Sequence, residues 1–189
     1  MTPGALQGGF AAAPVQSAHA FRAALQALSC PGRICVVSGA TPPAPLSVAA
    51  GVLILTLCDG TTPVHLAGAA DCGVVRDWIT FHTGAPIVAA AAASLAIGTW
   101  DALQPATRFA VGTPDFPDRS ATLIVEMPHL SASGPSLSGP GIQQSAQLSL
   151  PETAAFQANH ALFPMGFDCF FTAGPQLAAL PRSTCVKDI

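Results

Sequence analysis

Arg182-Ser183-Thr184 is a short segment whose side chains suit the binding of phosphate. A guanidinium donates paired hydrogen bonds to phosphate oxygens, and two neighbouring hydroxyls can donate more. The same residues could instead form an ion pair within the chain or contact another protein. The segment is therefore a candidate for ligand binding or for an interface, and the structural or interface role is favoured.

His82 and Arg22 are two further candidates, each with a structural alternative. His82 lies at the end of an expected helix, where its imidazole could act as an acid or base, or interact with the helix dipole. Arg22 lies on an expected apolar helix, where it could pair with a buried aspartate or reach a partner. In both cases the structural role is the simpler one.

Most catalytic groupings do not occur in this sequence. It has no tyrosine, its only lysine is Lys187, and its only glutamates are Glu126 and Glu152. A Schiff-base lysine inside a core pocket is therefore excluded. The P-loop, dinucleotide-binding, zinc-protease and serine-hydrolase motifs are all missing. We assign no catalytic residue from the sequence.

The histidines and cysteines lack the spacing of a metal site. No two histidines are four residues apart, no C-x-x-C occurs, and Cys30 and Cys35 have no second pair at zinc-finger spacing. Most of the six cysteines are interpreted as buried thiols that pack as small apolar side chains. They are Cys30, Cys35, Cys58, Cys72, Cys169 and Cys185. No metal and no cofactor is expected.

Charged residues make up only 9% of the 189 residues, against about 25% in an average soluble protein. The mean hydropathy is +0.50, which excludes a disordered chain. The net charge of -3 excludes the basic face of a nucleic-acid binder. So little charge predicts exposed apolar patches, which usually mark a protein interface. We therefore expect a subunit of an assembly.

A membrane protein is not expected either. The longest apolar run, residues 48–57, is half the length of about 20 residues that a spanning helix needs. Residues 1–20 contain no lysine or arginine that could form the start of a signal peptide. The sequence predicts a cytoplasmic protein.

Apolar periodicity and turn residues predict an α/β fold, a mixed β-sheet with helices packed on it. Residues 1–16 are expected to form an arm, and residues 17–189 a single domain. The first expected helix follows a Ser17 cap, and its apolar stripe is Phe21, Ala24, Leu25 and Leu28. A second is expected at residues 46–57, and a third begins after an Asp71 cap and ends at Gly84. A short helical turn is expected at 101–104 and a last helix at residues 151–160. Expected strands are residues 33–38, 62–66, 86–89, 94–97 and 121–127, and a hairpin of 167–172 and 177–180. Expected turns are Pro31-Gly32, Asp59, Asp168 and residues 131–141.

Seven segments of the chain follow one another in the order of a known family. They are Phe21-Arg22-Ala23-Ala24-Leu25 with Leu28-Ser29-Cys30-Pro31-Gly32, Leu55-Thr56-Leu57-Cys58-Asp59 with Thr62-Pro63-Val64, Phe81-His82-Thr83 with Ala85-Pro86, Ala121-Thr122-Leu123-Ile124-Val125, Leu137-Ser138-Gly139-Pro140-Gly141-Ile142, Phe163-Pro164-Met165-Gly166-Phe167-Asp168, and Leu180-Pro181-Arg182-Ser183-Thr184. Together they resemble the PhnH family, the H subunit of the bacterial carbon–phosphorus lyase core complex. His65 and residues 89–118 depart from the family pattern.

The resemblance implies a fold similar to that of pyridoxal-phosphate-dependent transferases, without the cofactor lysine. It also implies a homodimer-forming subunit that assembles with the G, I and J subunits of the complex. With the L subunit, that complex transfers a ribosyl triphosphate from ATP to an alkylphosphonate, and the J subunit later cleaves the carbon–phosphorus bond.

Two functions stay open for the chain itself. It could be an architectural subunit of this phosphonate-degrading complex, not catalytic alone. It could instead bind a nucleotide or phosphonate intermediate, or act on it, with Arg22, His82 and Arg182 converging on a pocket at the dimer interface.

Overall fold

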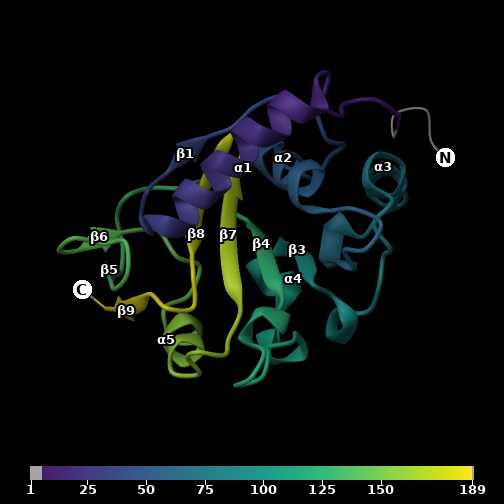
Figure 1. The fold of residues 1–189 in the computed structure, drawn as a ribbon. Coiled ribbons are helices and arrows are strands. Elements are labelled where there is room, and N and C mark those ends of the chain that lie inside the picture. The colour runs from purple at the N-terminus through teal and green to yellow at the C-terminus, as the bar shows by residue number, and fades with distance from the viewer. Residues whose placement is uncertain (1–5, 189) are drawn as a thin grey trace.

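The computed structural model describes residues 6–188, in which a larger and a smaller β-sheet are accompanied by helices (Figure 1). The helices are α1 (Ala13–Ser29), α2 (Val48–Leu57), α3 (Gly73–Thr83), α4 (Trp100–Leu103) and α5 (Ala154–His160). The strands are β1 (Cys35–Val36), β2 (Val64–Leu66), β3 (Leu95–Thr99), β4 (Thr122–Glu126), β5 (Ser136–Ser138), β6 (Ala146–Gln147), β7 (Asp168–Ala173), β8 (Gln176–Leu180) and β9 (Cys185–Lys187).

The larger sheet is mixed, with the strand order β1-β8-β7-β4-β3-β2. Strands β2, β3, β4 and β7 are parallel to their neighbours in this group. Strand β8 is antiparallel to β7, and β1 is antiparallel to β8. The smaller sheet, β6-β5-β9, is antiparallel. The predicted α/β fold with a mixed sheet and packed helices is confirmed.

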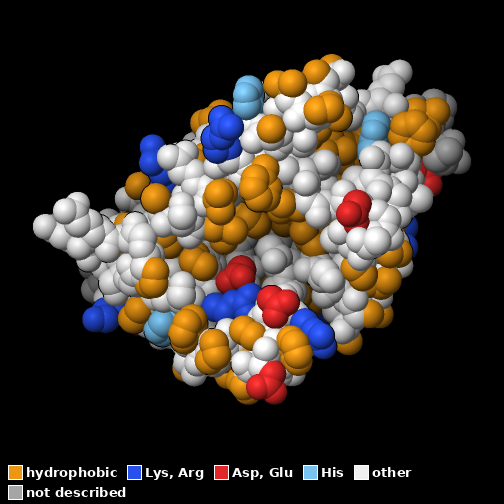
Figure 2. Space-filling view, viewed as in Figure 1, with side chains coloured by type: hydrophobic (Ala, Val, Ile, Leu, Met, Phe, Trp, Pro, Cys, Tyr) orange, Lys and Arg blue, Asp and Glu red, His pale blue; other side chains and the backbone are white. Residues whose placement is uncertain are grey.

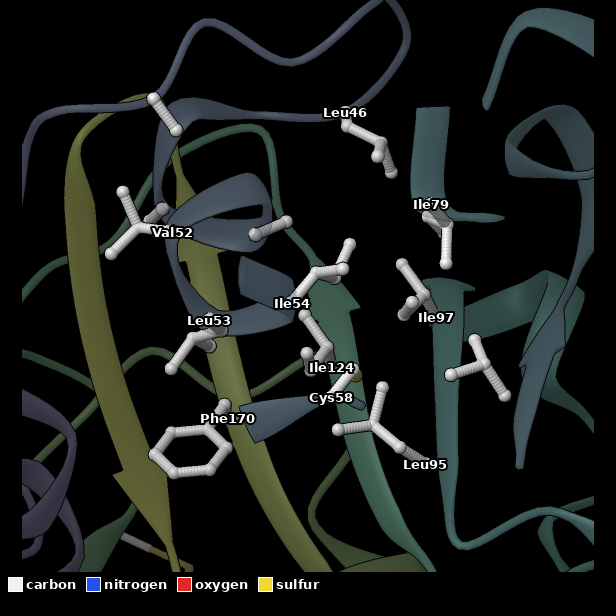
Figure 3. Packing of buried hydrophobic residues seen from close by; sticks show 14 of the residues in the cluster. Leu46, Val52, Leu53, Ile54, Cys58, Ile79, Leu95, Ile97, Ile124 and Phe170 are labelled. Atoms are coloured by element: carbon white, nitrogen blue, oxygen red, sulfur yellow. The ribbon is translucent and has the colours of Figure 1, made fainter. Parts of the chain in front are cut away.

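Two apolar clusters cover the two faces of the larger sheet. The first contains buried residues of α1, α2 and α3, and the second contains residues of α4, α5 and the smaller sheet. Because α2 is apolar on all sides, it can lie between the other helices and the sheet. Figure 3 shows Leu53 of α2 beside Phe170 and Ile54 beside Ile124. The expected helix at residues 46–57 is confirmed, with Ser47 as its N-cap.

Helix α1 differs from the prediction in its start and in its buried face. It begins at Ala13, not after Ser17, because Pro14 is compatible with a first helical turn. Its buried residues are Ala20, Ala24 and Ala27. Phe21 and Leu25 of the predicted apolar stripe are instead 53% and 55% exposed. Small alanines let the helix lie close to α2 and β8. Of the predicted stripe, Ala24 is buried and Leu28 packs partly against the core, so only Phe21 and Leu25 face outward.

Several other predicted boundaries are wrong. Asp71 does not cap α3, because the Asp71 carboxylate pairs with the Arg76 guanidinium instead. The N-cap of α3 is Cys72. Helix α5 begins at Ala154 rather than at residue 151. The weak strand expected at residues 86–89 is reduced to a single bridge between Ile87 and Val64.

The smaller sheet is the largest element that the sequence did not predict. Strand β5 lies within residues 131–141, which were expected to be only a turn, and β6 and β9 were not expected at all. These strands are two or three residues long, and Ser136 pairs with Lys187 from the far end of the chain. Neither periodicity nor local composition can indicate so short and distant a pairing.

The remaining sequence predictions concern the strands and turns, the N-terminal arm, the cysteines and a membrane-spanning helix. The strands expected at 33–38, 62–66, 94–97 and 121–127, the turn at 101–104 and the hairpin of 167–172 and 177–180 all have counterparts in the structure. The expected arm overlaps α1 at residues 13–16, and its first five residues lie outside the described part. The cysteines are free thiols, but the prediction that most of them are buried is wrong: only Cys58 and Cys169 are buried, and the other four are partly exposed. Within residues 6–188, no helix is both long and apolar enough to cross a bilayer.

Candidate functional site

Arg182 is held in a dense set of hydrogen bonds at the amino-terminal edge of β4 and β7. Its Nη2 and Nε donate to the two Asp168 carboxylate oxygens at 2.6 and 3.1 Å. Its Nη1 donates to the Pro117 carbonyl at 2.7 Å, and Nη2 also donates to Ser120 Oγ at 2.5 Å. The guanidinium therefore ties the start of β7 to the loop before β4 and has little capacity left for a phosphate.

The two hydroxyls that follow Arg182 do not complete a phosphate site. Thr184 is 2% exposed, and its Oγ1 has no hydrogen-bond partner among the described residues. Ser183 is half-buried in the connection from β8 to β9. The backbone carbonyl of Arg182 accepts a hydrogen bond from His160 Nδ1 at 3.0 Å. Residues 182–184 therefore connect β8 and β9 to the neighbouring elements through internal hydrogen bonds.

His82 lies in the last turn of α3 and fixes the N-terminal segment. Its Nε2 donates to the Gln7 carbonyl at 3.3 Å, and Trp78 Nε1 donates to the same oxygen at 2.9 Å. The His82 ring also lies 5.1 Å from the Trp78 ring and 4.9 Å from the Phe81 ring. These contacts give His82 a structural role in this chain.

Arg22 has a different environment from the other two candidates. It is exposed on α1, and no carboxylate of the described residues pairs with it. In Figure 1, α1 crosses the top of the sheet, α3 lies at the right, and the segment between β8 and β9 lies at the lower left. One chain therefore does not bring Arg22, His82 and Arg182 together. A shared pocket between two copies stays a prediction.

Several residues of the seven segments that resemble the PhnH family make close contacts within the fold. Gly141 has a φ of +80°, and a Cβ placed on it would lie 1.8 Å from the Ser29 carbonyl oxygen, so only glycine fits there. Gly32, which follows Pro31 in the turn after α1, has a φ of +92°. Asp59 Oδ1 accepts from the Thr61 N–H and hydroxyl at 2.8 and 2.7 Å, and these bonds lower the pKa of Asp59. These motif residues therefore stabilise turns and close contacts between segments of the fold.

Glu126, the last residue of β4, is a polar residue that the sequence analysis did not select. Its Oε1 accepts from the Ser47 N–H at 2.7 Å, and its Oε2 accepts from Thr172 Oγ1 at 3.0 Å. Burial raises the pKa of Glu126, while the bonds from Ser47 and Thr172 act in the opposite direction. Because Ser47 is the N-cap of α2, the carboxylate occupies the anion position at the amino end of that helix.

A cavity of about 360 Å³ opens beside Glu126, where β3 and β4 end. Thr99 and Asp101 also line it, and no lysine or arginine does. Two carboxylates without a cation disfavour the entry of a phosphate. Ligands of open α/β sheets bind at the carboxyl ends of strands. A charged residue at the end of the buried strand at 121–127 was therefore the signal that could have identified this site.

The described residues contain no group of three histidine, cysteine, aspartate or glutamate side chains that could hold a metal ion. Lys187 is exposed on β9, in the smaller sheet. It therefore does not fit the role of a lysine that holds pyridoxal phosphate at the larger sheet.

Comparison with known proteins agrees with the order of the motifs. Residues 8–187 match the family described as bacterial phosphonate metabolism protein (PhnH). The chain is 38% identical over 192 residues to the alpha-D-ribose 1-methylphosphonate 5-triphosphate synthase subunit PhnH of Rhizobium meliloti (strain 1021), which covers 94% of this chain and 93% of that protein. It is 28% identical over 200 residues to the putative C-P lyase subunit protein HtxG of Stutzerimonas stutzeri, with 95% of each chain covered.

The family match over residues 8–187 includes Trp78 and His82 of α3 and the Arg182–Asp168 pair, and it ends at the last residue of β9. The motif residues that carry the resemblance are also residues that the fold requires. The chain therefore belongs to the PhnH family of bacterial phosphonate metabolism proteins.

Proposed function

We propose that this chain is a subunit of the carbon–phosphorus lyase complex that makes ribose 1-alkylphosphonate 5-triphosphate from ATP and an alkylphosphonate. The observation that carries the proposal is the 38% identity, across 94% of the chain, to a subunit of the synthase for the methylphosphonate product. The second relative, a putative C-P lyase subunit, agrees with the same pathway.

Within that complex, the role of the chain is architectural. Three side chains with catalytic potential are engaged in internal contacts: Arg182 with Asp168, His82 with Gln7, and Glu126 with Ser47. Hydrogen bonds of this kind position backbone segments, and they favour a structural role for these three side chains. The proposal includes a cytoplasmic location, a homodimer, and assembly with the G, I and J subunits.

The proposal also keeps the similarity to the fold of pyridoxal-phosphate-dependent transferases. The parallel strands β2, β3, β4 and β7 with helices on both faces support it. The chain does not supply the lysine on which such enzymes depend, because Lys187 is exposed on β9.

Growth on methylphosphonate as the only phosphorus source tests the proposal. A strain that lacks its own PhnH-family subunit is complemented with this chain, and growth on phosphate serves as the control. Restored growth on methylphosphonate is expected. If the chain is expressed and folded but growth is not restored, the proposal is wrong.

The second candidate function, binding of a phosphate-containing ligand, has one observation in its favour. Arg22 is exposed and has no carboxylate partner among the described residues. Isothermal titration of the isolated protein with ATP tests this function, with Arg22→Ala as the variant. Binding that Arg22→Ala abolishes would favour a ligand-binding role over an architectural one.

A further inference from the structure

The charges of this chain are distributed unevenly along the sequence. All ten acidic residues follow Cys58, whereas the first 58 residues contain Arg22 and Arg33. The unevenness is visible on the surface. In Figure 2, the upper-left face over α1 and β1 shows basic and hydrophobic side chains, and the acidic side chains in view lie to the right and below. The α1 face is therefore locally basic on a protein whose net charge is -3.

The same face exposes an unusual amount of apolar surface. Phe21 and Leu25 on α1 are 53% and 55% exposed, and Val36 on β1 is 72% exposed. Phe21 and Leu25 also border a groove of about 350 Å³, whose floor includes Leu95 and Phe170 of the larger sheet. An apolar side chain from outside could enter this groove and contact the core. Large exposed apolar side chains next to such a groove are typical of a protein interface.

We propose that the face formed by Phe21, Leu25 and the groove, with Arg22 at its border, docks an apolar ridge flanked by carboxylates on another subunit of the complex. We call it the α1 docking face. This inference rests on the proposed function and adds a surface and a partner chemistry to it. The apolar side chains supply the buried area, and Arg22 supplies a guanidinium that can pair with a carboxylate of the partner.

A second copy of this chain fits the α1 docking face less well. In a two-fold contact centred on α1, both Arg22 side chains would lie in the same interface, and α1 itself carries no acidic residue that could neutralise them. A contact between this face and the acidic remainder of another copy would be head-to-tail and would propagate instead of closing. An acidic surface on a different subunit satisfies both the charge and the geometry.

Co-purification of the assembled complex tests the inference. The full chain is co-expressed with the other carbon–phosphorus lyase subunits, one of which carries the affinity tag, and the amount retained per complex is measured. The test variants are Leu25→Asp and Arg22→Glu. Their matched controls are Leu162→Asp, at a 43% exposed leucine beyond α5, and Arg119→Glu, at an exposed arginine before β4. Circular dichroism and thermal unfolding of each isolated variant verify that it is folded.

Leu25→Asp and Arg22→Glu should each lower retention about tenfold or more, as loss of a central contact does, while both controls stay within about twofold of the unchanged chain. Equal retention of all four variants would overturn the inference and leave the proposed function intact. Failure of the unchanged chain to assemble would overturn both. If Leu25→Asp turns a dimer of the isolated chain into a monomer without changing retention, the face binds a second copy and the inference is wrong.

Discussion

Replacing the partly buried Glu126 carboxyl group by an amide should change how stability depends on pH. The raised pKa of Glu126 means that the folded protein holds this proton more tightly than the unfolded chain does. Between the ordinary value of 4.5 and the raised pKa, unfolding therefore releases protons. The free energy of unfolding falls as the pH rises through this interval, by about 1.4 kcal/mol for each unit by which the pKa is raised.

Glu126→Gln removes that titration while keeping most of the contacts. The amide oxygen can still accept from the Ser47 N–H, and the amide nitrogen can donate to Thr172 Oγ1. Glu126→Ala instead leaves the Ser47 N–H without its acceptor, and it should cost about 2–4 kcal/mol, or about 5–15 °C in Tm. Glu126→Gln should be as stable as the unchanged protein at neutral pH, or more so.

Thermal and urea unfolding followed by circular dichroism, from about pH 4 to pH 8, measures the effect. The stability of the unchanged protein relative to Glu126→Gln should fall with pH and then level off. Glu152→Gln is the control for exchanging a carboxylate for an amide, because Glu152 is exposed and the amide oxygen can still accept the hydrogen bond from Trp100 Nε1. Identical pH slopes for the unchanged protein and Glu126→Gln would refute the reasoning, as would an Ala variant as stable as Glu152→Gln.

Three further predictions concern the contacts that hold the fold. Arg182→Ala leaves the Asp168 carboxylate without its partner and should lower the free energy of unfolding by about 2–4 kcal/mol in urea titrations; a loss below that of a surface substitution would contradict the internal role. Gly141→Ala should lower the free energy of unfolding by more than about 2 kcal/mol, because the added Cβ would meet the backbone of Ser29. Gly174→Ala, at a φ of +54° with no atom within 4 Å of the added Cβ, should cost about 1 kcal/mol in thermal unfolding, and equal losses for the two variants would argue against the steric reason. Burial raises the pKa of Cys58 to about 12, so iodoacetamide at mildly alkaline pH should label Cys58 only after the protein unfolds. Rapid labelling of Cys58 in the native protein, measured by mass spectrometry, would contradict its burial.

The sequence could predict the elements whose signals are local. The uninterrupted apolar run at residues 48–57 indicated a buried helix, and Ala173-Gly174-Pro175 indicated the hairpin that joins β7 and β8. The same kind of reasoning placed Ser17 at the start of the first helix and Phe21 on its buried face, and both were wrong. Periodicity finds an apolar stripe but does not tell whether alanines or larger side chains face the core.

The candidate site could be predicted only in part, because its contacts join distant residues. Arg182 was selected for its chemistry, but its partners lie 14, 62 and 65 residues away and consume its hydrogen bonds. Glu126 was passed over because nothing near it in sequence shows that Ser47, 79 residues earlier, donates to it. Side-chain type can indicate what a residue could do. Whether its donors and acceptors remain free for a ligand depends on which segments the fold brings next to it.

By itself, the sequence determined the α/β class, the lack of a core lysine and the shortage of charge that indicated a subunit. These are properties of residue type and local pattern, and they hold in any fold that the chain adopts. Only the tertiary structure decided that Arg182 is neutralised by Asp168, that Glu126 accepts from the N–H of the α2 N-cap, and that Phe21 and Leu25 face outward beside Arg22. Burial and pairing are properties of contacts between remote segments, so they come into existence only when the chain folds.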